Sequence, residues 1–241
     1  MESVEYLDWD SKFFGFKIGR ICIDTEQLRS GSLDKAVEEA RANKINCLYA
    51  ELPFGSPELL SYCSENKFLL VDLKTRLGKK LDNKVTRLSS SNITYKLENK
   101  YYPFLIKIAK QISIQSRFTH DLKFGREKSC KLYEEWLRKA FYEQYCDDLI
   151  LYVKDDKPAG FITLRIKEGH PFIDLLGVSN EQRGKKIGTC LIKAAERKLS
   201  IAGYNTLKVV TQGHNISALS TYQSMNFRIE DMNIYYHKWI D

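Results

Sequence analysis

The stretch from Pro171 to Ala202 constrains the fold of this 241-residue chain more than any other segment. It begins with a largely apolar run, residues 171–178, which is typical of a strand with both faces covered. A basic, glycine-containing loop follows, and residues 188–202 then have the apolar spacing of a helix. The apolar side of that helix consists of Leu191, Ile192, Ala195 and Leu199. A buried strand that leads into an amphipathic helix predicts a mixed α/β fold.

The rest of the chain alternates in the same way. The first part predicts strands at Ser3–Trp9, Lys17–Asp24, Cys47–Leu52 and Phe68–Leu77, with one helix after Ser32 as N-cap and another over Ser56–Asn66. The second part predicts helices near Tyr102–Ser113 and around Tyr133–Phe141, strands at Asp148–Val153, Ala159–Ile166, Thr206–Thr211 and Arg228–Trp239, and a short helix at Asn215–Ser224. The polar segment Lys79–Asn92 is typical of a linker. We therefore expect a smaller α/β domain over residues 1–85 and a second domain over residues 92–241.

Charge and composition exclude several classes of protein. Lys and Arg total 38 against 31 Asp and Glu, and the net charge of +7 fits an anionic ligand better than a nucleic-acid partner. Hydrophobic residues make up 43%, which excludes a largely disordered chain. No apolar run approaches the ~20 residues of a membrane helix, and the first residues lack the pattern of a secretory signal. We expect a cytoplasmic protein without a membrane partner.

The cysteines and histidines do not have metal-ligand spacing. Six cysteines and four histidines are scattered along the chain, and no Cys-x-x-Cys pair occurs. The sequence predicts no metal site and reduced thiols, most of them small buried hydrophobic residues.

The basic loop before residue 188 has the features of a site for phosphates. A helix N-terminus exposes unpaired N–H groups and about half a positive charge. Glycines let a ligand approach the backbone closely, and the side chains of Arg183, Lys185 and Lys186 add attraction. The same residues also fit a solvated basic loop ahead of a surface helix, so charge and glycine content alone leave both interpretations open.

The spacing in this loop resembles the acetyl-CoA pyrophosphate loop of the GNAT N-acetyltransferases. Their pattern, Arg/Gln-x-x-Gly-x-Gly/Ala after an apolar strand, is filled here by Arg183, Lys186 and Gly188, with Lys186 where a glycine is usual. The resemblance implies a GNAT fold with a mixed sheet, and acetyl-CoA as co-substrate. It also implies the residues that contact acetyl-CoA, which are Leu176, Val178, Gln182, Arg183, Gly184, Lys185, Lys186, Ile187, Gly188, Thr189 and Asn215.

A second motif of that family is matched by Asn215-x-x-Ala218-x-x-x-Tyr222, followed by Asn226-Phe227. Asn215 and Tyr222 are seven residues apart, which puts both on one face of a helix. The resemblance implies that Asn215 contacts the cofactor and that Tyr222 is the general acid that protonates the departing thiolate. An N-cap asparagine and a core tyrosine would account for the same two residues. Asn226 tolerates the left-handed conformation of a helix stop.

Two shorter stretches of the sequence resemble the bacterial TDP-fucosamine acetyltransferases. They are Leu7-x-Trp9-Asp10-Ser11-x-Phe13-Phe14-Gly15 and Ser116-Arg117-Phe118. That resemblance implies an N-terminal extra domain and a nucleotide-linked 4-amino-4,6-dideoxygalactose as acceptor, for synthesis of a surface polysaccharide. Arg117, with Lys123 or Arg126, is then expected to meet phosphate charge, and Phe118 or Phe124 to stack on a base or sugar. His120 is a candidate base. Arg117 in an ion pair and Phe118 in the core are the alternatives.

The implied reaction is direct attack of the amine on the thioester in a ternary complex, with an N–H near Leu176 to Val178 polarising the carbonyl. A covalent route through Cys190 would need a partner base that the sequence does not supply.

Other functions remain possible interpretations of the sequence: acetylation of a protein or peptide amine, a non-catalytic acyl-CoA-binding module, and a nucleic-acid binder suggested by the net charge alone. The sequence names no convincing base and leaves the oligomeric state open, a homodimer included.

Overall fold

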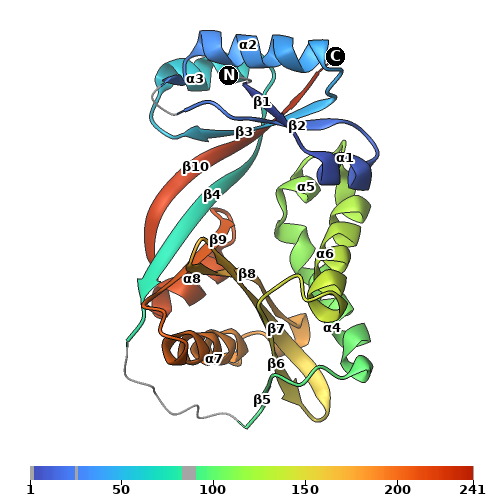
Figure 1. Cartoon of the computed structure of the whole chain (residues 1–241), viewed down its shortest axis with the longest axis vertical. Coiled ribbons are helices and arrows are strands. Elements are labelled where there is room, and N and C mark those ends of the chain that lie inside the picture. Colours follow the sequence, from blue (N-terminus) through green and yellow to red (C-terminus); the bar gives the residue numbers. More distant parts are fainter. Residues whose placement is uncertain (1–2, 25–26, 83–90, 241) are drawn as a thin grey trace.

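Residues 3–24, 27–82 and 91–240 are described by the computed structural model, and their strands form one continuous ten-stranded mixed sheet (Figure 1). The strand order is β1-β2-β3-β10-β4-β9-β8-β7-β6-β5. The strands are β1 (Val4–Tyr6), β2 (Ile18–Ile21), β3 (Cys47–Pro53), β4 (Leu69–Lys80), β5 (Ile93–Thr94), β6 (Asp148–Lys154), β7 (Lys157–Lys167), β8 (His170–Val178), β9 (Thr206–Gln212) and β10 (Arg228–Trp239).

Helices lie on the faces of this sheet. They are α1 (Asp8–Phe14), α2 (Ser30–Ala42), α3 (Pro57–Glu65), α4 (Tyr102–Ile112), α5 (Arg117–His120), α6 (Gly125–Tyr142), α7 (Ile187–Ile201) and α8 (Ile216–Ser224), with short 3-10 turns at Asn99–Tyr101, Ser113–Gln115 and Asn180–Gln182. The mixed α/β fold expected from the sequence is confirmed, and so are the strand, loop and helix of residues 171–202.

Strand β10 joins the two ends of the chain. It lies between β3 and β4 and is antiparallel to both, so that Tyr235 pairs with Glu51 on one side and Asp72 on the other. Strand β4 in turn pairs with β9. The sheet therefore runs through both of the expected domains. The division at residues 85 and 92 stays a prediction, because the central part of the proposed linker, residues 83–90, lies outside the described residues.

Two details of the N-terminal part differ from the sequence-based expectation. The expected strand Ser3–Trp9 ends at Tyr6, and helix α1 follows with Asp8 and Asp10 in its first turn, where acidic side chains favour the helix dipole. Gly15 ends α1 with a φ of 80°. Ser32 is not the N-cap of α2, because the helix begins two residues earlier and the hydroxyl of Ser32 instead accepts a hydrogen bond from the Arg29 amide.

The two faces of the β3-β10-β4 region differ in chemistry. One face carries the apolar side chains of Leu48, Leu52 and Ile234, which form a core with α2 and α3. The opposite face carries polar side chains, because residues directly opposite each other on paired strands share a face. We call this polar surface the cleft face; its members are Glu51, Asp72, Lys74, Arg76, Asn233 and Tyr235.

A buried polar cluster fixes the segment that faces this surface. The carboxylate of Asp121, which follows α5, accepts hydrogen bonds at Oδ2 from Trp239 Nε1 (2.9 Å) and lies 2.8 Å from His237 Nδ1. Both Asp121 and His237 are buried. Because His237 and Trp239 belong to β10, the cluster holds the α5 segment against the strand that carries the cleft face.

Burial of His237 predicts acid-sensitive stability. Burial lowers the pKa of His237 to about 4, although Asp121 acts in the opposite direction. The unfolded chain then binds a proton between about pH 6.5 and pH 4 that the folded chain does not bind, so the free energy of unfolding falls as the pH drops through that window. We expect a loss of about 2 kcal/mol between pH 7 and pH 5. His237→Asn should flatten this dependence in urea titrations, whereas His170→Asn, at an exposed position, should keep it. An unchanged slope in His237→Asn would contradict the assignment.

Candidate active site

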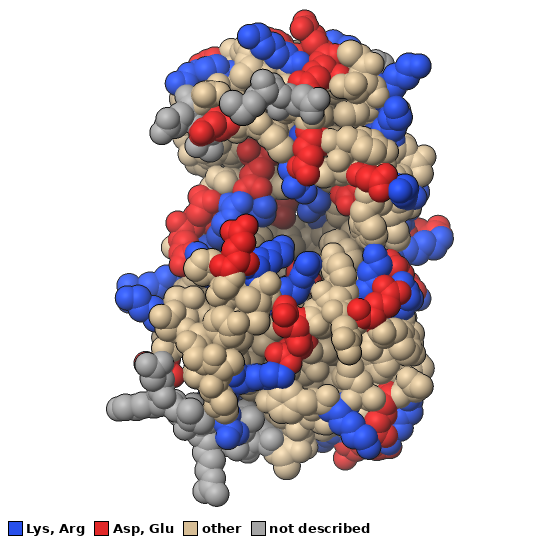
Figure 2. Space-filling model, in the orientation of Figure 1, with Lys and Arg blue, Asp and Glu red and all other residues tan. Residues whose placement is uncertain are grey.

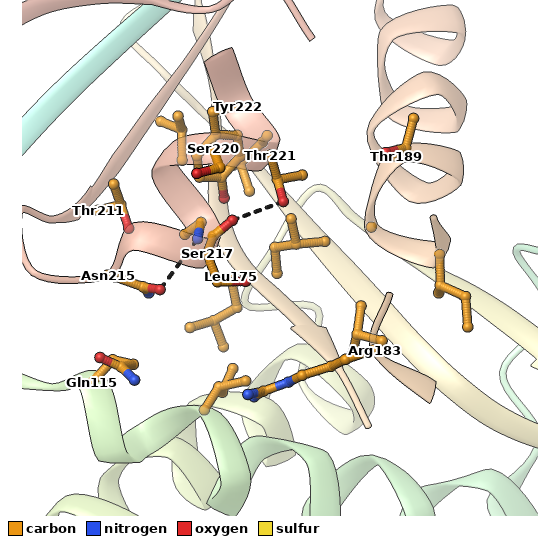
Figure 3. Close-up of a pocket in the computed structure, with 18 of the residues that line it drawn as sticks. Gln115, Leu175, Arg183, Thr189, Thr211, Asn215, Ser217, Ser220, Thr221 and Tyr222 are labelled. Atoms are coloured by element: carbon orange, nitrogen blue, oxygen red, sulfur yellow. Dashed lines mark hydrogen bonds between the residues drawn. The ribbon is translucent and has the colours of Figure 1, made fainter. Parts of the chain in front are cut away.

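A cavity of about 490 Å³ opens between β8, β9 and the first turns of α7 and α8 (Figure 3). Ten of the eleven residues that the sequence assigned to cofactor binding line it: Leu176, Val178, Gln182, Arg183, Gly184, Lys186, Ile187, Gly188, Thr189 and Asn215. Tyr222 lines it as well, and Lys185 does not. The structure thus brings together the two sequence motifs, which are separated by residues 189–214.

The cavity exists because β8 and β9 separate. These parallel strands pair only at Phe172 with Lys208 and at Ile173 with Val209. Immediately beyond, the register of β8 against β7 shifts, and Asp174 is the extra residue of a β-bulge. Bulges bend a strand and redirect its side chains, and they are frequent beside active sites. The strand ends that follow, at residues 174–178 and 209–212, then form opposite walls of the cavity.

The N-terminus of α7 supplies hydrogen-bond donors to one end of the cavity. The first intrahelical bond recorded at this end runs from Cys190 N to Lys186 O, so the preceding amides have no helical acceptor. Gly184 and Lys186 have φ values of 78° and 59°, which curl the loop around that end. Lys186 therefore adopts the conformation for which a glycine is usual at this position. A Cβ on Gly188 would meet nothing nearer than 3.8 Å, so the space in front of the helix is open.

Two of the three basic side chains of the loop, Arg183 and Lys185, have different surroundings. Arg183 lines the cavity and reaches across it toward Gln115 (Figure 3). Lys185 Nζ donates to Gln182 Oε1 (2.9 Å) and to the Glu181 carbonyl (3.4 Å). Arg183, like Lys186, lines the cavity and is positioned to contact an anion there, whereas Lys185 is not.

This difference predicts unequal effects of charge reversal. Arg183→Glu should raise the KM for acetyl-CoA by about tenfold, the cost of losing one charge-assisted hydrogen bond. Lys185→Glu should raise it less, through long-range repulsion that 0.5 M salt largely screens. Steady-state kinetics at low and high salt separate the two variants. If the two variants raised the KM for acetyl-CoA by the same factor at both salt concentrations, Arg183 would make no direct contact.

Helix α8 positions the second motif. Asn215 is its N-cap, since Oδ1 accepts from the Ala218 amide (3.2 Å), and Nδ2 lies 3.4 Å from Gln212 Oε1. Asn215 also lines the cavity, so capping and ligand contact are compatible roles. Tyr222 is 4% exposed, and burial raises its pKa above the usual range. The phenol consequently stays protonated at neutral pH. Asn226 follows the end of α8 with a φ of 65°, the left-handed conformation expected for an asparagine at a helix stop.

The three residues assigned to the acceptor lie outside the cavity. The guanidinium of Arg117 lies over the rings of Tyr49, Phe118 and Tyr235, at 4.2–5.0 Å from their centroids. Its Nε is buried and has no hydrogen-bond partner among the described residues. Phe118 is 2% exposed and packs in a core with Phe14 and Phe124, so it presents no free ring face. His120 is exposed, and its ring lies edge-on to His214, 4.6 Å away.

Several residues of the site carry no motif and were missed. Gln115 and Tyr133 line the cavity from the α4–α5 connection and α6. Asp174 lines it from the bulge, and burial raises its pKa. An aspartate in an otherwise apolar strand was the one visible signal in the sequence, since a buried strand rarely carries a carboxylate.

Other features expected from the sequence can be placed as well. All six cysteines are free thiols; Cys22 is exposed, and Cys190 does not line the cavity. Within the described ranges, no group of three or more His, Cys, Asp or Glu side chains could hold a metal ion. In the same part of the chain, none of the helices combines the length and apolar character needed to cross a bilayer.

Comparison with known proteins agrees with this geometry. Residues 108–227 match the Acetyltransferase (GNAT) family. A curated relative, the spore coat polysaccharide biosynthesis protein SpsD of Bacillus subtilis (strain 168), is 22% identical over 135 residues. The match covers 56% of this chain and 46% of the relative, so the chain spans less than half of that protein's length.

Solved structures resemble nearly the whole chain. A GCN5-related N-acetyltransferase from Sphaerobacter thermophilus superposes with a TM-score of 0.67 at 12% identity, over 98% of this chain and 76% of that protein. A tandem GNAT protein from the clavulanic acid biosynthesis pathway gives a TM-score of 0.56 at 14% identity, over 93% of this chain and 75% of that protein. At these identities the likeness concerns the fold, including the strands that precede residue 108.

Proposed function

This chain carries a GNAT acetyltransferase domain, and from that premise we propose that it transfers the acetyl group of acetyl-CoA to the amine of a nucleotide-linked amino-dideoxysugar. The acceptor proposed is of the dTDP-4-amino-4,6-dideoxygalactose type, and the product would serve synthesis of a surface polysaccharide. The observation that carries the proposal is the cavity, because it joins a helix N-terminus, a strand opening and a protonated tyrosine in one space.

The cavity fits acetyl-CoA. The unpaired amides at the start of α7 and the Arg183 guanidinium provide donors and positive charge for the pyrophosphate. The open space at Gly188 allows phosphate oxygens to approach the backbone. Between β8 and β9, the strand opening has the shape to receive the extended pantetheine arm, with Asn215 beside it. Acetyl-CoA supplies the activated acyl carbon, and the protein groups described below act on it.

The cleft face is the surface proposed for the acceptor. Figure 2 shows a hollow between the upper and lower parts of the molecule, with lysine, arginine and carboxylate side chains around it. On the cleft face, Lys74 and Arg76 are half-buried and share the carboxylate of Glu51. Burial alone would raise the pKa of Glu51, but hydrogen bonds from Asn233, Lys74 and Arg76 lower it to about 2.

The cations of this surface are balanced by carboxylates, so an anionic acceptor would bind here through individual guanidinium and ammonium contacts and not through net charge. Glu51 offsets one of the cations, Lys74 or Arg76, and Asp231 pairs with Arg76 at the exposed edge (2.6 Å). Arg117 adds a buried guanidinium above the ring of Tyr235. Cations with aromatic rings around them suit a nucleoside diphosphate, whose phosphates bind guanidinium groups and whose base stacks on aromatic faces. The relative SpsD, whose printed name refers to polysaccharide biosynthesis, supports a sugar acceptor.

Tyr222 is proposed to complete the reaction. The acceptor nitrogen attacks the acetyl carbon, the carbon–sulfur bond breaks, and the Tyr222 hydroxyl donates its proton to the departing sulfur. The raised pKa of Tyr222 keeps that proton available at neutral pH. Backbone amides near Leu176 to Val178 are suited to hold the acetyl oxygen while negative charge develops on it.

A panel of acceptors tests the proposal. Thiol release from acetyl-CoA is measured with TDP-linked 4-amino- and 3-amino-dideoxysugars, the same sugars without the nucleotide, and peptides with free amines. We expect turnover with a TDP-linked sugar, a product heavier by one acetyl group in mass spectrometry, and a much higher KM for the free sugar. Preferred turnover of peptides would instead indicate a protein or peptide acetyltransferase. Binding of acetyl-CoA without any turnover would indicate a non-catalytic module.

A further inference from the structure

Asp72 is a buried carboxylate with an unsatisfied oxygen. It lies on β4, opposite Tyr235, and its side chain belongs to the cleft face. Asp72 is 9% exposed, and its Oδ1 has no hydrogen-bond partner among the residues that the structure describes. A buried carboxylate oxygen without a donor is costly, and such a group in a native structure calls for a functional explanation.

Two histidines connect Asp72 to solvent. His214 Nδ1 lies 3.8 Å from Asp72 Oδ1, a separation that one water or a small shift bridges. The ring of His214 lies edge-on to that of His120, with 4.6 Å between the centroids, and His120 is exposed. The three side chains come from β4, the β9–α8 turn and α5, so no local motif accounts for their meeting.

This group borders the acetyl-CoA cavity. His214 lies between Gln212 and Asn215 in the chain, and both of these line the cavity. Gln212 also pairs across the sheet with Lys74, two residues along β4 from Asp72. Tyr133 lines the cavity and interacts electrostatically with Asp72. A group held at the cleft face beside Asp72 is thus close to Gln212 and Tyr133, which line the same cavity as Tyr222.

We propose that Asp72 is the general base of the transfer, which accepts a proton from the acceptor amine at Oδ1 and passes it to solvent through His214 and His120. The inference rests on the proposed transfer to an amine, but it holds for a sugar or a peptide acceptor alike. It supplies the base that the sequence does not reveal.

The protons and bonds balance in this scheme. The acceptor enters as an ammonium, and Asp72 takes one proton to give the neutral amine. Nitrogen then forms a bond to the acetyl carbon, and the carbon–sulfur bond breaks as Tyr222 protonates the sulfur. The nitrogen loses its second proton to solvent or to Asp72 after the first proton has left through His214. Tyr222 regains its proton from solvent, so the net products are the amide, the free thiol and one proton.

The charged surroundings of Asp72 agree with this role. Burial raises the pKa of Asp72 to about 6, and Arg117, His120 and Lys74 act against that rise. Tyr133 and Tyr235, which belong to other elements packed there, face the same region. Burial lowers the pKa of His214. A carboxylate that titrates near pH 6 is ionised at neutral pH and is still basic enough to accept a proton from an ammonium held in place.

Asp174 is the rival candidate. It lines the cavity at the bulge, and burial raises its pKa too. It differs from Asp72 in its exposure, since its side chain is open to the cavity, and its charged neighbours are Arg165 and Lys167. The experiment must therefore separate these two carboxylates.

The test compares kcat/KM for the best acceptor of the panel from pH 5 to pH 9 in four proteins: wild type, Asp72→Asn, Asp174→Asn and Asp156→Asn. Asp156 is exposed in the β6–β7 turn at a φ of 58°, which asparagine tolerates, so its variant controls for loss of an acidic side chain. We expect the wild-type profile to show a first rise through about pH 6 and then a fall above the pKa of the free amine, because the acceptor enters as an ammonium.

Asp72→Asn should lose the first rise and reduce kcat/KM at pH 7 at least ~10-fold, with the KM for acetyl-CoA and the melting temperature little changed. Asp72→Glu should recover the first rise. If Asp72→Asn does not fold, His214→Gln carries the test and should reduce kcat several-fold below pH 7. The proposal is overturned if the first rise survives in Asp72→Asn, if it disappears in Asp174→Asn instead, or if His214→Gln behaves as wild type. Turnover of peptides alone contradicts only the sugar acceptor, and turnover of no amine contradicts both proposals.

Discussion

Tyr222→Phe should lower kcat by at least ~10²-fold and leave the dissociation constant of acetyl-CoA nearly unchanged. The substitution removes one hydroxyl from a side chain that is 4% exposed and lines the cavity. Without it the departing sulfur leaves as a thiolate, and the loss of general acid catalysis has this typical size. The ring itself remains packed edge-on against Phe227, 5.4 Å between centroids, so the fold should be retained. Stopped-flow or steady-state thiol release and calorimetry of acetyl-CoA binding measure the two quantities separately.

A buried tyrosine elsewhere provides the control for this substitution. Tyr236 is 6% exposed and packs in the core under α2 and α3, and it does not line the cavity. Tyr236→Phe should leave kcat unchanged. A Tyr222→Phe enzyme that turns over at the wild-type rate would remove Tyr222 from the reaction. A fall in kcat together with a weaker acetyl-CoA affinity would assign it to binding.

Much of the C-terminal part follows from local sequence patterns. The apolar run of β8 and the spacing of α7 predict a strand and a helix within a residue of their observed bounds. Asn215 and Asn226 mark the ends of α8 through side-chain capping and tolerance of a positive φ. These signals are short-range, because each depends on backbone geometry within a few residues.

The acceptor side could not be predicted in this way. Asp72 and His214 meet because β4 pairs with β9, and His120 joins them because Asp121, the residue after it, contacts β10. Strand order is a long-range property that periodicity does not encode. The position of Arg117 could not be predicted from local sequence either. An arginine at this position suggested a phosphate contact, but its place over three aromatic rings depends on the Asp121–His237 contact that holds α5 to β10. The helix at Asp8–Phe14 was missed because its aromatic residues favour a strand, whereas tertiary packing of Phe14 stabilises the helix.

Gly188→Leu should weaken acetyl-CoA binding by about 10²-fold and leave the fold intact. Gly188 is the second residue of α7 and lines the cavity, and a Cβ there would make only ordinary contacts with Thr221 (3.8 Å) and Val178 (3.9 Å). A leucine side chain there would occupy the position of the phosphates and separate them from the helix amides. Loss of two hydrogen bonds to a charged group, about 1.5 kcal/mol each, corresponds to this change in the dissociation constant. Because leucine has a higher helix propensity than glycine, stability should stay the same or rise by a few tenths of a kcal/mol.

Gly31 offers a matched control, since it is also the second residue of a helix, α2, and a Cβ there would meet nothing within 4 Å. Gly31→Leu should raise helix propensity in the same way and leave acetyl-CoA binding unchanged in calorimetry. The contrast between these two variants separates the helix N-terminus that faces the cavity from a helix N-terminus as such. Equal affinities in Gly188→Leu and the wild type would mean that the phosphates do not lie against α7, and the placement of acetyl-CoA between β8 and β9 would then be wrong.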